Sequence, residues 1–172
     1  MILRLGRRGR GFDSPSSPPV SYVTFVLKSH MKFDRIKMEA ARAIKRGDAE
    51  ALRANEHQIL YEVENRLIDA SSEHEDYMTY WIASHKNKDE ATEMFEVFMN
   101  TCSTVFRLDK YEEIMELYSY PTMIGAIAAE NIDIVDYVVG YQGKDVLVEE
   151  LCAQYGDEKD WPAGLLNVFN SL

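Results

Sequence analysis

Histidine and acidic side chains, the usual ligands of zinc and similar metal ions, gather in the first half of the chain. The group consists of His57, Glu73, His74, Glu75, Asp76 and His85. No two of the histidines have a metal-ligand spacing such as His-Glu-x-x-His. Residues 73–76 are instead typical of an acidic helix start, which the helix dipole stabilises. We therefore expect solvated or structural roles here, and we predict no metal site and no cofactor.

Cys102, which lies between Thr101 and Ser103, is a candidate nucleophile. An isolated cysteine is more often a small buried core residue, and we expect that role for it. The sequence has no glycine-rich phosphate-binding loop and no Gly-x-Ser-x-Gly motif. It therefore predicts a protein that is not an enzyme.

The only cysteines are Cys102 and Cys152, which are too few for a disulfide framework and form no Cys-x-x-Cys motif. Such cysteine usage is typical of a reducing compartment, so we expect a cytoplasmic protein. No apolar run approaches the roughly 18 residues that a membrane-spanning helix needs, and we predict no membrane association.

Charge is distributed unevenly along the chain. The whole sequence carries a formal charge of −10, yet residues 1–30 contain five basic side chains and one acidic side chain. The first thirty residues therefore carry +4, and the remainder carries −14. A body this acidic repels phosphate groups, which argues against direct binding of DNA or RNA.

Six acidic side chains occupy predicted helix faces opposite the apolar stripes of the C-terminal half: Glu112, Glu113, Glu116, Glu130, Asp133 and Asp136. Charged faces of this kind usually serve solvation alone. The alternative interpretation is a negative surface, which either engages a basic site on a partner or imitates the spacing of nucleic-acid phosphates.

These side chains are positioned by helices, and the clearest helices lie in residues 121–143. Apolar residues recur there at helical spacing in two runs, which are Met123, Ile124, Ile127 and Ala128, then Ile134, Val135, Val138 and Val139. Pro121 suits the first turn of one helix, Asn131 a cap between the two, and Gly143 the end. The stretch predicts two short helices turned back on each other. Such a hairpin has one apolar side, which neighbouring helices must cover.

The hairpin resembles an ankyrin repeat, whose pattern runs Thr-Pro-Leu-His-x-Ala-Ala, then Gly-His, then Ile-Val-x-x-Leu-Leu. The residues at matching places are Pro121, Thr122, Met123, Ile124, Ala126, Ile127, Ile134, Val135, Val138 and Val139. A weaker second match consists of Ala43, Ile44, Gly47, Asp48, Ala51 and Leu52. Glu130 occupies the glycine place of the pattern, the Thr-Pro order is reversed, and no histidine follows.

The resemblance also implies a binding surface. In ankyrin-like proteins the partner is bound by the turn before the first helix and by the inner side of that helix. Carried over by position, this implies that Ser119, Tyr120, Thr122 and Gly125 contact a protein partner.

Tyrosine is frequent in this chain, with ten among 172 residues. Tyr118, Tyr120, Tyr137 and Tyr141 lie around the hairpin, and tyrosine is favoured at binding hot spots because it offers large contact area for little entropy loss. We therefore add Tyr118 to the predicted partner-binding residues. Tyr137 lies inside the second helix, where the pattern is compatible with both core and surface.

Apolar stripes predict helices along the rest of the chain from Met31 onward. These helices cover approximately residues 33–46, 49–70, 77–84, 91–99, 101–107, 110–118, 145–155 and 160–169. Their predicted N-terminal caps are Asp48, Asp109, Asp145 and Asp160. We predict an all-α single domain over residues 31–172, built as stacked antiparallel helical hairpins in an ankyrin-like or α-solenoid array. Another kind of hairpin array and a closed helical bundle are the alternatives.

Residues 1–30 differ from the rest of the chain, because they are basic, rich in glycine, proline and serine, and without helical periodicity. We expect a disordered segment or a leader that does not belong to the native protein. Residues 11–15, Gly-Phe-Asp-Ser-Pro, are what the conserved T-arm of a tRNA gene encodes. The native chain would then start at Met31, in a gene beside a tRNA gene, as in phages and mobile elements. A basic nucleic-acid-binding arm and a vector remnant at residues 29–31 are the alternatives.

The combined features favour a non-enzymatic protein-protein interaction module of a phage or mobile element. It would bind a protein in the host cytoplasm, and binding could inhibit that protein. The alternative function is an acidic nucleic-acid mimic that inhibits a DNA- or RNA-binding protein. An enzyme with unrecognised chemistry and a structural oligomer subunit are further alternatives. The sequence indicates neither the identity of the partner nor the oligomeric state.

Overall fold

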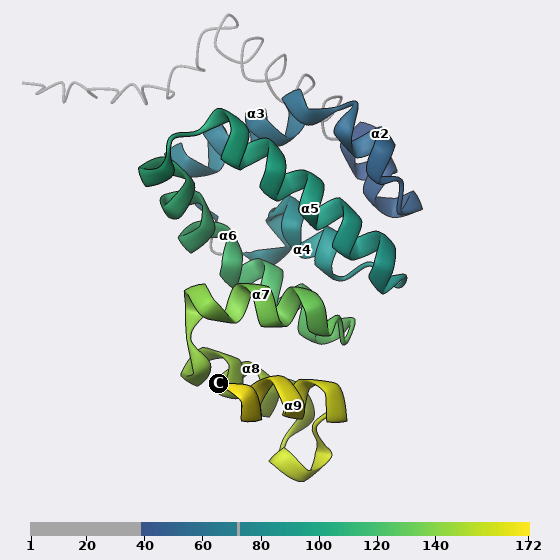
Figure 1. Cartoon of the computed structure of the whole chain (residues 1–172), viewed down its shortest axis with the longest axis vertical. Helices are drawn as coiled ribbons and strands as arrows, with labels where there is room; N and C mark the ends of the chain where they lie inside the picture. The colour runs from purple at the N-terminus through teal and green to yellow at the C-terminus, as the bar shows by residue number, and fades with distance from the viewer. Residues whose placement is uncertain (1–38, 72) are drawn as a thin grey trace, which may run out of the picture. The chain divides into compact units, whose positions relative to one another are not determined.

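The computed structural model describes residues 39–71 and 73–172, and every regular element within these ranges is a helix (Figure 1). After helical turns at 39–46 come α2 (Ala49–Arg53), α3 (Glu56–Ile68), the 3-10 turn η1 (His74–Asp76), α4 (Met78–Ala83), α5 (Lys88–Val105), α6 (Leu108–Ala128), α7 (Ile132–Gln142), α8 (Lys144–Tyr155), the 3-10 turn η2 (Glu158–Asp160) and α9 (Ala163–Ser171). The predicted all-α class is confirmed for these residues.

All the described residues belong to one compact unit. The interpretation of residues 1–30 as a leader, with Met31 as the native start, lies outside the described residues. The first turns of the helix predicted from residue 33 lie outside them as well.

Several helix ends lie where local sequence signals place them. Asp48 and Asn131 cap α2 and α7, and each side chain accepts a hydrogen bond from the backbone N–H three residues further on. Gly47 and Gly143 take the left-handed backbone conformation at helix ends, with φ of 68° and 89°. Glu130, at the glycine place of the ankyrin pattern, also has a positive φ of 53°. The chain therefore takes a left-handed turn at this position without a glycine.

The predicted break before Pro121 is wrong, because α6 runs without interruption through it from Leu108 to Ala128. A proline inside a helix removes one backbone hydrogen bond and usually costs about 3 kcal/mol. Pro121 is buried, and α6 packs against α4, α7 and α8, so tertiary contacts stabilise the continuous helix. The turn that an ankyrin-like hairpin places before its first helix therefore does not exist at this position.

Four other boundaries also differ from the predictions. The helix predicted over 49–70 is divided at Asn55, whose side-chain amide donates a hydrogen bond to the Ala51 carbonyl at 2.7 Å. The short helix predicted at 101–107 is the last part of α5. At the C-terminal end, Gly143 rather than Asp145 precedes α8, and Asp160 lies in η2 rather than capping α9.

Helix α4 lies against α5 and α6, and α6 packs in turn against α7 (Figure 1). The contact between α6 and α4 depends on Gly125. A Cβ atom at that position would lie 2.5 Å from the Tyr80 carbonyl oxygen and 3.2 Å from the Ser84 backbone nitrogen. Only glycine allows the two backbones to approach this closely. The hairpin of α6 and α7 is thereby held on α4.

The predicted apolar stripe of α7 faces the core. Ile134, Val135, Val138 and Val139 are all buried there. Asn131, at the start of α7, is also buried, and its amide nitrogen donates to the Lys88 carbonyl at 3.2 Å. This bond fixes the beginning of α7 against the beginning of α5.

Candidate functional site

Four of the five residues predicted to contact a partner are buried: Tyr118, Ser119, Thr122 and Gly125. They occupy the interior side of α6, where Gly125 packs on α4 and the Thr122 hydroxyl donates to the Tyr118 carbonyl at 2.6 Å. These side chains are not accessible to a partner in the folded chain, and the predicted surface is corrected accordingly. The carry-over from the ankyrin pattern failed because α6 continues through the position of the expected turn.

Tyr118 is a core residue rather than a surface anchor. Its ring packs edge-on against Tyr77, with centroids 5.2 Å apart, and lies 5.1 Å from the ring of Phe98. Burial raises the pKa of the Tyr118 hydroxyl far above its usual value. That hydroxyl has no hydrogen-bond partner among the described residues. Tyr118 thus contributes ring packing to the interior.

Tyr120 is the one predicted contact residue of α6 that remains exposed, with 40% of its surface accessible. Its hydroxyl donates a hydrogen bond of 2.7 Å to the Glu150 carboxylate on α8. This bond, together with burial, raises the pKa of Tyr120 to about 12. The side chain is therefore partly exposed, and its hydroxyl is hydrogen-bonded to the neighbouring helix α8.

A separate group of tyrosines, Tyr111, Tyr137 and Tyr141, forms a surface cluster on α6 and α7, here called the tyrosine cluster. Tyr137 and Tyr141 are 45% and 41% exposed, and their ring centroids are 6.1 Å apart. Tyr137 also packs edge-on against Phe95, at a centroid distance of 5.7 Å. Tyr137 therefore belongs to the surface on one side and to the packed interior on the other.

The hydroxyl groups of the tyrosine cluster interact with one another. Burial raises the pKa values of all three, and hydrogen bonding to Tyr111 raises that of Tyr137 further. All three phenols therefore stay protonated and neutral near pH 7. Tyr120 does not join them, because it lies nine positions after Tyr111 and therefore on the opposite side of α6.

All six acidic side chains of the predicted negative surface are exposed, namely Glu112, Glu113, Glu116, Glu130, Asp133 and Asp136. Glu113 forms an ion pair with Lys110 at 2.6 Å. Glu112 lies near enough to Tyr141 for its charge to raise the pKa of that phenol. Asp133 and Asp136 lie on α7, the helix that carries Tyr137 and Tyr141. The tyrosine cluster consequently has an acidic border.

A second surface, which the sequence did not predict, is a groove of about 890 Å³ beside α4. We call it the Trp81 groove. Its lining residues are Ala41, Ile44, Lys45, Glu62, Glu75, Asp76, Met78, Trp81, Ser84, His85 and Lys86. They come from the helical turns at 39–46, from α3, from η1 and α4, and from the segment that follows α4. No local motif indicates such a groove, because its parts are far apart in the sequence.

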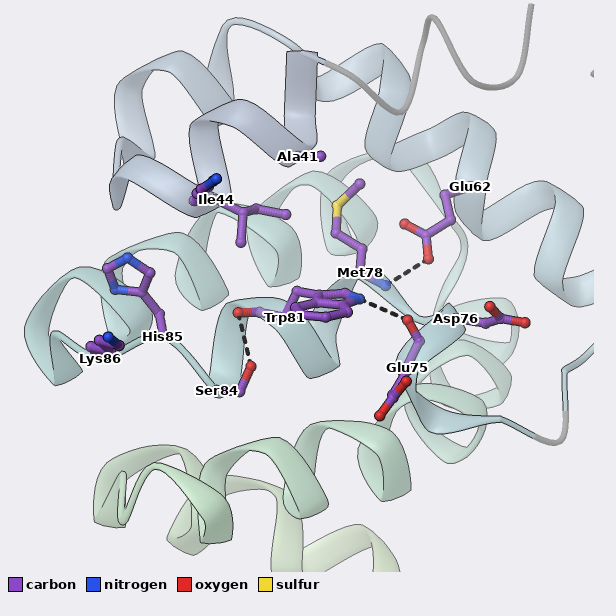
Figure 2. Close-up of a pocket in the computed structure, with 11 residues that line it drawn as sticks. Ala41, Ile44, Glu62, Glu75, Asp76, Met78, Trp81, Ser84, His85 and Lys86 are labelled. Carbon is purple, nitrogen blue, oxygen red and sulfur yellow. Dashed lines mark hydrogen bonds between the residues drawn. The ribbon is translucent and has the colours of Figure 1, made fainter. Parts of the chain in front are cut away.

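Trp81 lies across the middle of this groove (Figure 2). Its indole N–H donates to the Glu75 carbonyl at 2.7 Å, and 54% of its surface is exposed. Beside it, the Met78 backbone N–H donates to the Glu62 carboxylate at 2.8 Å, and Glu62 is buried. In the sequence, Trp81 lies within the helix predicted over residues 77–84, and that prediction did not indicate that its side chain faces outward.

The two ends of the Trp81 groove carry opposite charge. Figure 2 shows His85 and Lys86 at one end and Glu75 and Asp76 at the other, with Trp81 between them. The His85 Nδ1 atom lies 3.6 Å from a carboxylate oxygen of Glu90. The groove thus combines an apolar middle with two polar ends.

The structure also places the candidate nucleophile and the histidines that the sequence singled out. Cys102 is buried, as predicted, and burial raises its pKa to about 12, so the thiol is protonated near neutral pH. The described ranges contain no group of three or more metal-ligating side chains, and His57, His74 and His85 do not converge. None of the helices in these ranges combines the length and apolarity needed to cross a membrane.

The described residues thus define an all-helical protein with two exposed aromatic surfaces, the tyrosine cluster and the Trp81 groove. The chain belongs to DUF5903, a family of unknown function, whose pattern matches residues 39–167. The match includes both surfaces. No curated protein and no solved structure matches the chain.

Proposed function

We propose that the protein is a non-enzymatic protein-protein interaction module that binds a partner protein through the tyrosine cluster. The supporting observation is the exposure of Tyr137 and Tyr141 side by side on a helix whose other face is fully buried. Tyrosines held in this way lose little side-chain entropy on binding, since the hairpin already fixes them. The surface is therefore suited to recognition rather than to chemistry.

The acidic border indicates what kind of partner fits. Glu112, Asp133 and Asp136 lie on the helices that carry the tyrosines, and all three are exposed. A partner with an apolar or aromatic centre and a lysine- or arginine-rich rim would complement this arrangement. We propose that it is a host protein and that binding inhibits it, as expected for a protein of a phage or mobile element.

The second candidate function is mimicry of a nucleic acid. It is favoured by the exposure of all six predicted carboxylates and by the net charge of −10. The two functions differ in their salt dependence, because contacts between exposed charges are screened whereas apolar contacts are not. Binding that weakens steeply with salt favours mimicry, and binding that tolerates salt favours docking through the tyrosine cluster.

We also propose a cytoplasmic site of action and an array of stacked hairpins as the architecture. The first is supported by two free cysteines, Cys102 in the interior and Cys152 at the surface. The second is supported by the succession of helix pairs, in which α6 packs on α7 and α8 packs on α9. An ankyrin-like version of this array has to accommodate Pro121 within α6.

The test is affinity capture from cells that naturally contain the gene, with wild-type protein and two variants as bait. We expect Tyr137→Ala with Tyr141→Ala to lose the captured partner by tenfold or more, as for two hot-spot residues. Tyr120→Ala is the matched control, because that tyrosine is equally exposed but lies on the opposite side of α6. Loss of the partner with Tyr120→Ala, and its retention in the double variant, would disprove the proposal. Thermal melts establish that each variant is folded.

A further inference from the structure

The Trp81 groove has a composition that points to a ligand of its own. An exposed indole ring is costly in water, and about half of Trp81 is accessible. Its N–H already donates to the Glu75 carbonyl, so the ring offers an apolar surface to the groove. The other tryptophan, Trp161, is only 7% exposed and packs edge-on against Phe169. The exposure of Trp81 is therefore a property of this groove and not of tryptophans in this chain generally.

The ends of the groove determine the polarity of what it can bind. His85 and Lys86 lie at the end where α4 finishes, and Glu75 and Asp76 lie where it begins (Figure 2). Lys45 adds a third basic group to the lining, while Glu90 faces His85 and offsets part of this positive charge. A ligand that fits must be negative near Lys86 and positive near Glu75.

The length of α4 determines how far apart the ligand's charges must be. Six helical residues, Met78–Ala83, rise about 9 Å, and the charged groups lie just beyond both ends. Two side chains seven residues apart on a helix are separated by a similar rise of about 10.5 Å. A large apolar side chain three or four residues from each of them would then lie opposite Trp81.

We propose that the Trp81 groove binds an amphipathic helix of a partner protein. This helix has an acidic residue near its N-terminal end, a large apolar residue in the middle and a basic residue about seven positions after the acidic one. The helix dipole favours that order of charges. The acidic end lies at Lys86 and the basic end at Glu75, so the bound helix runs antiparallel to α4. This site is separate from the tyrosine cluster, and failure of either proposal leaves the other standing.

The first experiment uses synthetic peptides of about fourteen residues, long enough to form a helix on binding. One peptide carries glutamate, leucine and arginine in the proposed order. A second peptide has the same composition, with glutamate and arginine exchanged. Added to the full chain, the first should shift the emission of Trp81 to shorter wavelength and bind at least tenfold more tightly than the second. Trp161 provides a constant background, because it is buried in the unbound protein.

The second experiment exchanges the charges of the groove. Glu75→Lys combined with Lys86→Glu should reverse the preference between the two peptides. Both side chains are exposed, and the bond from Trp81 goes to the backbone of Glu75, so the fold should tolerate the change. Glu149→Lys, an exposed carboxylate outside the groove, is the matched control and should leave the preference unchanged.

Three outcomes would overturn this proposal. The first is that the two peptides bind equally well, and the second is that the exchanged variant keeps the wild-type preference. The third is that Trp81→Ala binds the first peptide as tightly as wild type does. A fourth outcome concerns oligomeric state. If sedimentation shows a dimer that Trp81→Ala dissociates, the groove holds a second copy of the chain, and the partner helix is ruled out.

Discussion

The tyrosine cluster and the Trp81 groove are both exposed aromatic surfaces, but the chain builds them in opposite ways. Tyr137 and Tyr141 lie four residues apart on α7 and are both exposed, and Tyr137 packs against Phe95. The half-buried Tyr111 completes the cluster, and its hydroxyl donates to the Met99 sulfur at 3.7 Å. Trp81 lies among residues from five segments, and its indole N–H is already bonded to the Glu75 carbonyl. The first surface therefore offers neutral hydroxyls with an acidic border, and the second offers an apolar face between opposite charges.

The difference shows how a small helical protein can present two kinds of recognition surface. A surface formed along one helix depends on the register of that helix alone. A surface formed between several segments depends on how those segments pack, here on the packing of the turns at 39–46, α3, η1 and α4. Helix α4, which carries Trp81, is in turn held against α6 by the close approach at Gly125. The two surfaces are nevertheless connected, because α6 contacts both α7 and α4.

The largest expected effect tests that connection. Val135→Asp places a charge in the fully buried interface of α7, and we expect it to lower the free energy of unfolding by about 4 kcal/mol or more. Because α6 is shared, the helical signal in circular dichroism and the native emission of Trp81 should be lost together on heating. Asp136→Ala, at the exposed neighbouring position, is the control and should change stability by less than about 0.5 kcal/mol. If part of the helical signal were lost while the emission of Trp81 stayed native, the two surfaces would instead fold independently.

A smaller effect is expected at the contact between α6 and α4. Gly125→Ala introduces a Cβ atom that would lie 2.5 Å from the Tyr80 carbonyl oxygen, which is backbone and cannot move aside cheaply. We expect a loss of about 1–3 kcal/mol in the free energy of unfolding, measured by chemical denaturation. Because Tyr80 precedes Trp81, the emission of Trp81 should change as well.

Gly140 provides the matched control for that substitution. It lies within α7, and a Cβ atom there would have no neighbour within 4 Å. Gly140→Ala should therefore stabilise the protein by about 0.5–1 kcal/mol, since alanine favours helix over the unfolded chain. If both alanine variants had the same stability, close packing at Gly125 would not be what joins the two surfaces.

The comparison also shows which features a sequence can reveal. The caps at Asp48 and Asn131 and the turn at Gly143 depend on residues within a few positions, so local chemistry was enough to predict them. The apolar stripe of α7 was predictable for the same reason. The tyrosine cluster was partly predictable, since Tyr137 and Tyr141 are four residues apart and must share a helix face.

Features that depend on tertiary contacts were not predictable. Pro121 is a strong local signal for a helix start, yet packing on three sides carries α6 through it. That single difference moved Ser119, Thr122 and Gly125 from an expected binding surface into the interior. The Trp81 groove depends on segments that extend from Ala41 to Lys86, and helical periodicity contains no information on how such segments meet.

The smallest expected effect separates Tyr120 from the tyrosine cluster by its titration. The pKa of Tyr120 is raised to about 12 chiefly by its hydrogen bond to Glu150, whereas burial is the largest cause for Tyr137 and Tyr141. Glu150→Gln removes the carboxylate, so the pKa of Tyr120 should fall toward 10 while the pKa values of the cluster stay unchanged. NMR of protein with labelled tyrosine rings resolves the separate titrations, and Tyr120→Phe assigns the signal.

The same bond has a consequence for stability at high pH. The folded chain holds the Tyr120 proton more tightly than the unfolded chain does, because its pKa is about 12 when folded and about 10 when unfolded. The resulting stabilisation is fully present below pH 10 and is lost as pH rises from 10 to 12. In Glu150→Gln, the ionisation of Tyr120 should therefore cost less folding stability as the pH rises. The effect is small, because the Tyr120 side chain is exposed. An equal change in the pKa of Tyr137 would mean that the two sides of α6 are electrostatically coupled, and Tyr120→Ala would then no longer be a neutral control for the tyrosine cluster.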